Sequence, residues 1–192
     1  MRIRSFIALE FPTNIQLEIA KKISNLVQCY PKPMVRWVDP KIVHLTLSFL
    51  GDQTTSDLKN LADRMRDELH FTQPIILRIN KPGFFPNNNK PRVLWVDIEY
   101  QPTLHKLQEK IEAICSRIGI LNEEKRFSPH LTLGRIRNYR EIPDLKKFLN
   151  DFSTISFEDI DPVNIRDVKI FKSELKQTGP VYNILYSITV IT

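Results

Sequence analysis

The chain of 192 residues is poor in glycine, in cysteine and in long apolar runs. With only five glycines, it contains neither the G-x-G-x-x-G pattern of dinucleotide-binding folds nor a Walker A sequence, which disfavours both classes of nucleotide enzyme. Cys29 and Cys115 lie far apart and outside any C-x-x-C or Cys/His cluster, which argues against a disulfide scaffold and a zinc site. No apolar run approaches the ~18 residues that span a bilayer, and Glu10 and Pro12 interrupt the first apolar stretch too early for a signal peptide. We therefore expect a cytoplasmic protein with no membrane segment.

The composition is otherwise that of an ordinary globular protein. Hydrophobic residues make up 42% and charged residues 26% of the chain, which disfavours disorder and coiled coils. The length suits one domain or two small lobes. Lys and Arg exceed Asp and Glu by 28 to 22, and the resulting net charge of +6 favours an anionic partner.

The pattern of apolar residues predicts helices and strands in mixed order. Helices are predicted over residues 13–28, 56–69 and 103–118, and from Pro143 onward. Strands are predicted over residues 3–11, 35–38, 43–50, 74–80, 92–99, 130–136, 166–172 and 181–191. Thr13 and Gln16 have the spacing of a capping box at the start of the first helix. Turn-rich links at residues 81–91 and 177–180 predict hairpins, so the fold class is α+β with antiparallel sheets.

The most informative feature is a repeated tetrapeptide, His-Leu-Thr-Leu, at residues 44–47 and 130–133. It holds two of the four histidines of the chain, and each copy follows an arginine-aromatic pair, Arg36-Trp37 or Arg126-Phe127. A single copy is more often an ordinary strand, but its duplication makes coincidence a poor explanation. The repeat therefore indicates two related halves, which a pseudo-twofold axis would bring face to face.

Strand geometry decides which side chains of each repeat lie together. Successive side chains of a strand alternate between its faces, so His44 and Thr46 share one face, and Phe49 falls on the other with the leucines. The same alternation places Arg135 on the face opposite to that of His130, unless a bulge redirects it. The leucine faces would pack against the helices, and the polar faces would line a cleft.

Two histidines and two hydroxyl donors suit cleavage of a phosphodiester by in-line displacement. One imidazole removes the proton from the attacking oxygen, and the other protonates the leaving oxygen. Their unperturbed pKa, near ~6.5, suits both tasks. The near-identical contexts of His44 and His130 do not distinguish acid from base, and the preferred assignment is His44 as acid and His130 as base.

The phosphate itself needs donors and cations. The hydroxyls of Thr46 and Thr132 would hold its two non-bridging oxygens. Further positive charge is available near the repeats, from Arg36, Arg126, Arg135 and Arg137.

Longer segments around the repeats resemble the two-histidine phosphoesterase superfamily. These are His-Leu-Thr-Leu-Ser-Phe-Leu-Gly at residues 44–51 and Arg-Phe-Ser-Pro-His-Leu-Thr-Leu-Gly-Arg at residues 126–135. Within it, residues 4–9 and 93–96 are similar to the RNA 2′,3′-cyclic phosphodiesterase family, also called 2′-5′ RNA ligase. The resemblance covers essentially the whole chain. It implies one domain, residues 1–192, of two pseudo-twofold-related lobes, each with an antiparallel sheet and outer helices, and an active-site cleft between the lobes.

The resemblance also implies an activity and a set of site residues. The activity is opening of a 2′,3′-cyclic phosphate to a 2′-phosphate, without a metal or other cofactor, on RNA with a cyclic phosphate end. His44 and His130 match the catalytic histidines of the family, and Thr46 and Thr132 its phosphate-binding threonines. Arg135 matches its usual basic residue after the second motif. We expect the protein to act as a monomer.

Two aromatic residues are further candidates for the substrate site. Trp37 and Phe127 stand next to arginines before the two repeats, and either ring would stack on a nucleobase, because every base has a π-face.

Alternative functions stay open. Within the enzyme class, they are 2′-5′ RNA ligation and hydrolysis of a small cyclic nucleotide. The alternative of another class is a non-catalytic RNA-binding module, which gives no account of the duplicated motif.

Overall fold

The computed structural model describes the chain except residues 1, 87–89, 121–126, 178 and 192. The α-helices are α1 (Thr13–Cys29), α2 (Thr55–Glu68), α3 (Pro102–Arg117) and α4 (Leu145–Ser153). The short 3₁₀ helices are η1 (Pro40–Ile42) and η2 (Tyr139–Glu141). The strands are β1 (Arg2–Glu10), β2 (Val35–Trp37), β3 (His44–Thr54), β4 (Ile75–Leu77), β5 (Ile79–Phe85), β6 (Val93–Ile98), β7 (His130–Ile136), β8 (Val163–Ile165), β9 (Asp167–Lys176) and β10 (Gly179–Thr189).

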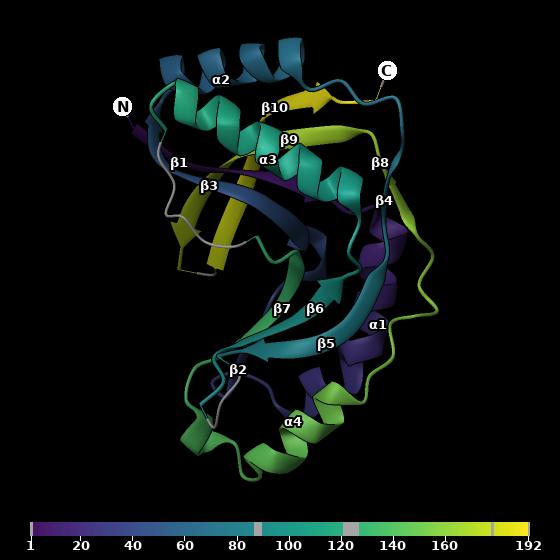
Figure 1. Cartoon of the computed structure of the whole chain (residues 1–192). Helices are drawn as coiled ribbons and strands as arrows, with labels where there is room; N and C mark the ends of the chain where they lie inside the picture. Colours follow the sequence, from purple (N-terminus) through teal and green to yellow (C-terminus); the bar gives the residue numbers. More distant parts are fainter. Residues whose placement is uncertain (1, 87–89, 121–126, 178, 192) are drawn as a thin grey trace.

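The main sheet is continuous, but at one point, here called the strand joint, two neighbouring strands share a single residue pair. Its strand order is β10-β9-β1-β3-β7-β6-β5, β2 also pairs with β7, and the named strands pair antiparallel throughout. One residue pair, Leu45 with Leu131, joins β3 to β7. Figure 1 shows the strands before and after this joint as two groups, with α2 and α3 over the first and α1 and α4 beside the second. The α+β class with antiparallel sheets is confirmed.

Most predicted elements are present, and the hairpins of β5 with β6 and of β9 with β10 are confirmed. Two strand predictions were incomplete. Residues 79–85, mostly assigned to a link, form β5, and β8 was not predicted. In the described part of the chain, no helix is long and apolar enough to cross a membrane.

The helix starts differ from the predictions for reasons of hydrogen bonding. The predicted capping box of α1 is wrong, because Pro12 is the cap residue and the Gln16 side chain donates to the Lys41 carbonyl at 3.3 Å. A capping box is present instead at α2, where Thr54 and Asp57 bind each other's backbone N–H. Helix α4 begins after Asp144 rather than at Pro143.

The two repeated strands carry the same β-bulge. Pairing skips Leu47 in β3, between Thr46 and Ser48, and it skips Leu133 at the equivalent place in β7. The extra residue reverses the alternation beyond it, so Phe49 and Arg135 are exposed, and the burial patterns of residues 44–50 and 130–136 are identical. The face assigned to Phe49 by simple alternation is therefore wrong, and the bulge allowed as an exception for Arg135 is present.

Candidate active site

The strand joint gathers the four polar residues of the repeats. Because β3 and β7 run antiparallel through the Leu45–Leu131 pair, the residues before and after each leucine flank this pair. They are His44, Thr46, His130 and Thr132, and all four are half-buried. Burial lowers the pKa of His44 and the charge of His130 adds to this effect, so the two imidazoles lie within electrostatic reach of each other.

Both imidazoles are held in the same way by backbone. His44 Nδ1 donates to the carbonyl oxygen of Ile42, and His130 Nδ1 donates to that of Ser128, both at 2.7 Å. A carbonyl only accepts, so Nδ1 carries the hydrogen in each ring. In the neutral form, Nε2 is then the free lone pair, and in the charged form it is a donor. Each histidine therefore offers Nε2 for proton transfer.

Three aromatic rings surround His44. Its ring centroid is 4.9 Å from that of Phe6, 6.3 Å from Phe171 and 5.1 Å from Tyr182, which meets it edge-on at 88°. Burial lowers the pKa of His44 below its ordinary value of 6.5, against the opposing effects of the Ile42 carbonyl and of Glu10. The neutral form of His44 is favoured.

His130 faces a different pair of rings. The ring of Phe85 lies 5.4 Å from His130 at 81°, and that of Trp95 lies 6.1 Å away. Phe85 and Trp95 stack on each other at 4.8 Å and 27°. Trp95 lies against the backbone of Gly83, where a Cβ atom would stand 2.4 Å from Trp95 Cζ2. The absence of a side chain at Gly83 therefore permits the stacked pair.

Each histidine has a carboxylate directly across from it on a neighbouring strand. Glu10 pairs with His44 in register, and Asp97 pairs with His130. The carboxylate of Glu10 forms an ion pair with Lys169. Burial raises the pKa of Asp97, while the Ile98 N–H, the charge of His130 and the Asn80 side chain oppose this rise. The two halves of the site therefore differ in electrostatics although their backbones match.

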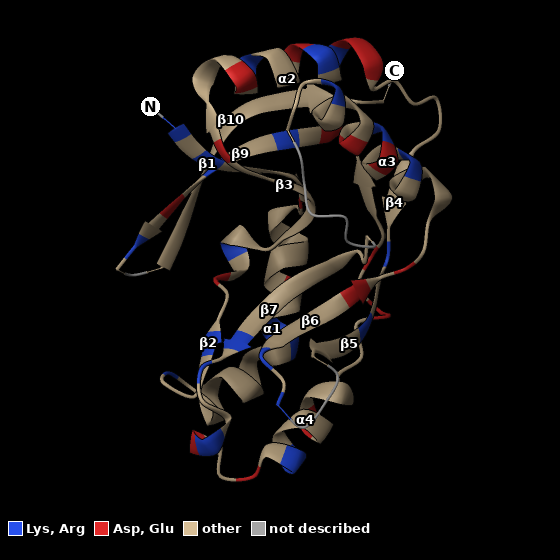
Figure 2. Ribbon diagram, turned by 60° about the vertical axis from the view of Figure 1, so that its left-hand side comes forward, with Lys and Arg blue, Asp and Glu red and all other residues tan. Residues whose placement is uncertain are grey.

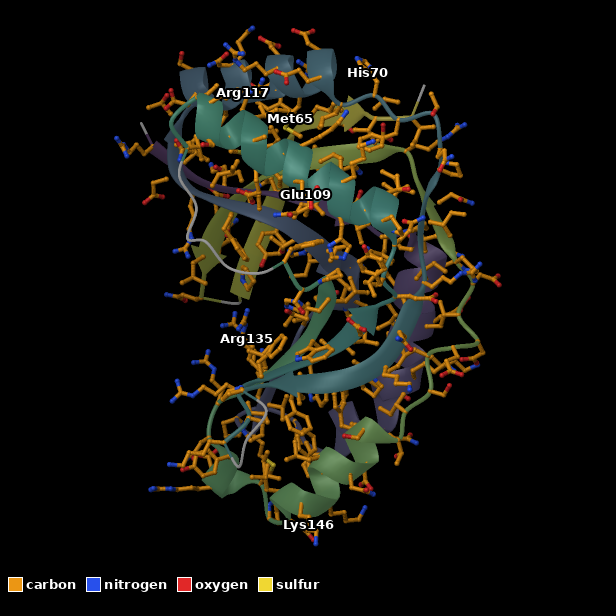
Figure 3. All side chains as sticks on the ribbon, in the orientation of Figure 1. Met65, His70, Glu109, Arg117, Arg135 and Lys146 are labelled. Atoms are coloured by element: carbon orange, nitrogen blue, oxygen red, sulfur yellow. The ribbon has the colours of Figure 1, made fainter. Side chains whose placement is uncertain are left out.

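Two arginines lie on paired strands close to Tyr182. Arg36 of β2 is paired with Arg135 of β7, and both guanidinium groups lower the pKa of Tyr182, which burial raises more strongly. Figure 3 shows Arg135 projecting into the space between the two strand groups. Figure 2 shows basic residues along β2 and the adjoining end of β7. Arg137 is exposed beyond that end, and Arg126 lies outside the described residues.

The structure separates the two predicted stacking residues from the imidazoles. Trp37 donates its Nε1 hydrogen to the Tyr30 carbonyl at 2.9 Å, and its ring packs against Gly134 of β7, the strand with which β2 pairs. The ring of Phe127 lies 5.3 Å from that of His105, in a groove beside the site.

Sequence reasoning missed the other residues that surround the imidazoles. They are Phe6, Phe49, Phe85, Trp95, Asp97, Phe171 and Tyr182. They come from six strands, and no spacing along the chain marks them as neighbours. A usable signal was the alternation within residues 93–98, which places Trp95 and Asp97 on one face. Among the described residues, no group of three or more His, Cys, Asp or Glu side chains is placed to hold a metal ion.

Comparison with known proteins identifies the family. Residues 14–95 and 96–182 each match the LigT-like phosphoesterase family. The RNA 2′,3′-cyclic phosphodiesterase of Thermotoga maritima is 32% identical over 95% of this chain and 93% of its own, and that of Methanothermobacter thermautotrophicus is 26% identical over 95% and 96%. The crystal structure of E. coli LigT superposes with a TM-score of 0.75 at 21% identity, covering 100% of this chain and 98% of that one. The chain therefore belongs to the LigT-like phosphoesterase family, as the two repeated tetrapeptides indicated.

Proposed function

We propose that this protein hydrolyses the 2′,3′-cyclic phosphate ends of RNA to 2′-monophosphates, with His44 and His130 as its acid/base pair. The observation that carries the proposal is the identical presentation of the two imidazoles, each with Nδ1 bound to a backbone carbonyl and Nε2 free for proton transfer. The relatives named above as RNA 2′,3′-cyclic phosphodiesterases support this substrate.

The reaction needs one proton acceptor and one proton donor. Water attacks phosphorus and loses a proton to the base, while the bond from phosphorus to O3′ breaks and O3′ takes a proton from the acid. Burial among aromatic rings favours the neutral form of His44, which is the form that a general base needs. His130 then takes the role of the acid, with Asp97 in register opposite it. This assignment reverses the one preferred from sequence.

The hydroxyls and the arginine hold the substrate. Thr46 and Thr132 flank the strand joint on either side of the imidazoles, where they donate to the non-bridging oxygens. Phe49 and Arg135 occupy equivalent positions after the two bulges, one with an exposed ring and the other with a cation. The ring of Phe49 receives the terminal nucleobase, and Arg135 binds the negative charge of the phosphate. Arg36 adds to the positive charge near the phosphate.

The duplicated strands also support a two-lobe domain. The strand groups on either side of the Leu45–Leu131 pair are the two lobes, and the site is the cleft between them. The family match in two consecutive segments, residues 14–95 and 96–182, agrees with a duplicated architecture.

One experiment tests the activity and the pair together. Turnover of an oligonucleotide with a 2′,3′-cyclic phosphate end is measured, and the product is identified as the 2′- or 3′-monophosphate. We expect the 2′ isomer, and we expect His44→Ala and His130→Ala each to lower kcat by about 10²- to 10⁴-fold. The matched control is His70→Ala, because His70 is exposed at the end of α2.

The outcomes separate the alternatives. A folded His44→Ala or His130→Ala protein that keeps more than about a tenth of wild-type kcat contradicts the pair. RNA binding without turnover, unchanged in both variants, identifies a non-catalytic binding module. Turnover of cyclic mononucleotides alone identifies a small-nucleotide enzyme, and joining of two RNA ends identifies a ligase.

A further inference from the structure

A groove of about 400 Å³ lies beside the site, bordered by the end of β6, the start of α3 and residues 127–129. Three rings line it, with His105 between the other two. The His105 centroid is 4.6 Å from that of Tyr100 and 5.3 Å from that of Phe127. Tyr100 is 70% exposed, so the groove presents aromatic surface to an incoming ligand.

The groove adjoins the catalytic pair through His130. Ser128 lines the groove, and its carbonyl oxygen is the one that holds His130 Nδ1. Asp97, which lies opposite His130, lines the groove as well. The groove therefore begins on the Nδ1 side of the imidazole whose Nε2 meets the substrate.

The geometry of an RNA end indicates which part of the substrate lies at the groove. The base at C1′ and the chain at C5′ leave the terminal ribose from opposite ends of the sugar. The terminal base is assigned to the side of Phe49 and Arg135. The preceding nucleoside then leaves the ribose on the other side, toward the groove.

We propose that the groove is a subsite for the nucleoside that precedes the cyclic end, with its base stacked on the rings of Tyr100, His105 and Phe127. The inference rests on the proposed function. Bases of any sequence stack on such rings, because each has a π-face. Asp97 and Ser128 offer acceptors for base amino groups and for the ribose 2′-hydroxyl, and the Asp97 carboxylate repels phosphate. The occupant is therefore a nucleoside rather than a phosphate.

The test compares a nucleoside 2′,3′-cyclic phosphate with a dinucleotide that ends in the same cyclic nucleotide. Loss of one aromatic stacking partner typically weakens nucleic-acid binding roughly 5- to 100-fold, so we expect wild-type kcat/KM to favour the dinucleotide by a factor in this range, through KM. The Tyr100→Ala variant, and Tyr100→Ala with Phe127→Ala, should lose this preference and keep wild-type turnover of the mononucleotide.

Two variants serve as controls. Tyr100→Phe keeps the ring and should keep the preference. Leu17→Ala removes a similarly exposed apolar side chain from α1, outside the groove, and should change the turnover of neither substrate. Turnover of the mononucleotide also reports whether a variant is folded. If the double variant is misfolded, the test rests on the single variant Tyr100→Ala, whose side chain is exposed in the wild type.

The outcomes distinguish this inference from the function on which it rests. If wild type turns over both substrates without preferring the dinucleotide, or if Tyr100→Ala keeps the full preference, the subsite is refuted and the activity stands. If wild type turns over neither cyclic substrate, the proposed function fails and the subsite fails with it.

Discussion

Asp97 lies directly opposite His130 in the antiparallel register of β6 and β7. The carboxylate of Asp97 thus faces the imidazole proposed as the general acid. The equivalent carboxylate of the other half, Glu10, forms an ion pair with Lys169. The proposed acid and base roles are therefore distinguished by the surroundings of each histidine, which are buried aromatic rings at His44 and Asp97 at His130, rather than by the repeated strands themselves.

The Asp97→Asn variant should lower kcat, because the imidazole of His130 loses the carboxylate that faces it. Stability should not fall at neutral pH, because burial raises the pKa of Asp97 and the charged carboxylate is disfavoured in the fold. Steady-state kinetics and thermal unfolding measure the two effects. Glu99→Gln, which alters an exposed carboxylate beyond β6, is the control. An unchanged kcat in Asp97→Asn would refute this role.

The lowered pKa of His44 predicts the acid limb of the pH profile of kcat/KM. A base with a lowered pKa stays neutral to lower pH, so kcat/KM should hold until the pH is below 6.5, the ordinary value. The limb is measured with substrate well below KM and should be absent from the residual activity of His44→Ala. An acid limb at or above pH 6.5 would contradict His44 as the base.

The same shift predicts a loss of stability in acid. Below pH 6.5 the unfolded chain takes up a proton at His44 before the folded protein does, so the free energy of unfolding falls as pH decreases toward the lowered pKa. The His44→Gln variant lacks this contribution and should lose less stability between about pH 7.5 and pH 5.5. Urea unfolding at both values measures the difference, with His70→Gln as control. Equal losses in wild type and His44→Gln would refute burial as the cause of the shift.

The fold was largely predictable because its elements carry periodic apolar patterns. The strand predicted over residues 130–136 has the bounds of β7, and the helix predicted over residues 103–118 differs from α3 by one residue at each end. Such features depend on residues close in sequence. The capping box predicted for the first helix is wrong because Gln16 binds Lys41, a residue outside its own helix.

The candidate site was predictable as far as the repeated tetrapeptides reach. The bulges at Leu47 and Leu133 could be anticipated only as an exception for Arg135, because a bulge is defined by the pairing with the partner strand. Phe6 and Tyr182 are at opposite ends of the chain, and only the pairing of β1 with β9 and of β9 with β10 brings their rings to 5.0 Å.

Arg135 should matter for substrate binding more than for the chemical step. The Arg135→Ala variant should raise KM for a cyclic-ended RNA roughly tenfold or more, as expected for a hydrogen bond to a charged group, with a smaller change in kcat. The KM of this variant should also depend less on salt, because one contact with the anionic substrate is lost. Arg137→Ala is the matched control, since Arg137 is an exposed arginine just beyond the same strand. Equal effects of the two substitutions would show that only net charge matters.

Gly83 should be intolerant of any side chain, because of the ring that covers it. In Gly83→Ala, the new Cβ would stand 2.4 Å from Trp95 Cζ2 and 2.5 Å from Trp95 Cη2, so the indole must move off β5. Overpacking of this kind costs about 1–3 kcal/mol, and the free energy of unfolding should fall by that amount. Displacement of Trp95 also disturbs Phe85, which stacks on it and meets His130, so kcat should fall as well. Adding Trp95→Phe removes the distal indole atoms and should restore part of the stability, which a double-mutant cycle measures as a coupling. Additive losses in that cycle would show that the clash with the indole is not the cause.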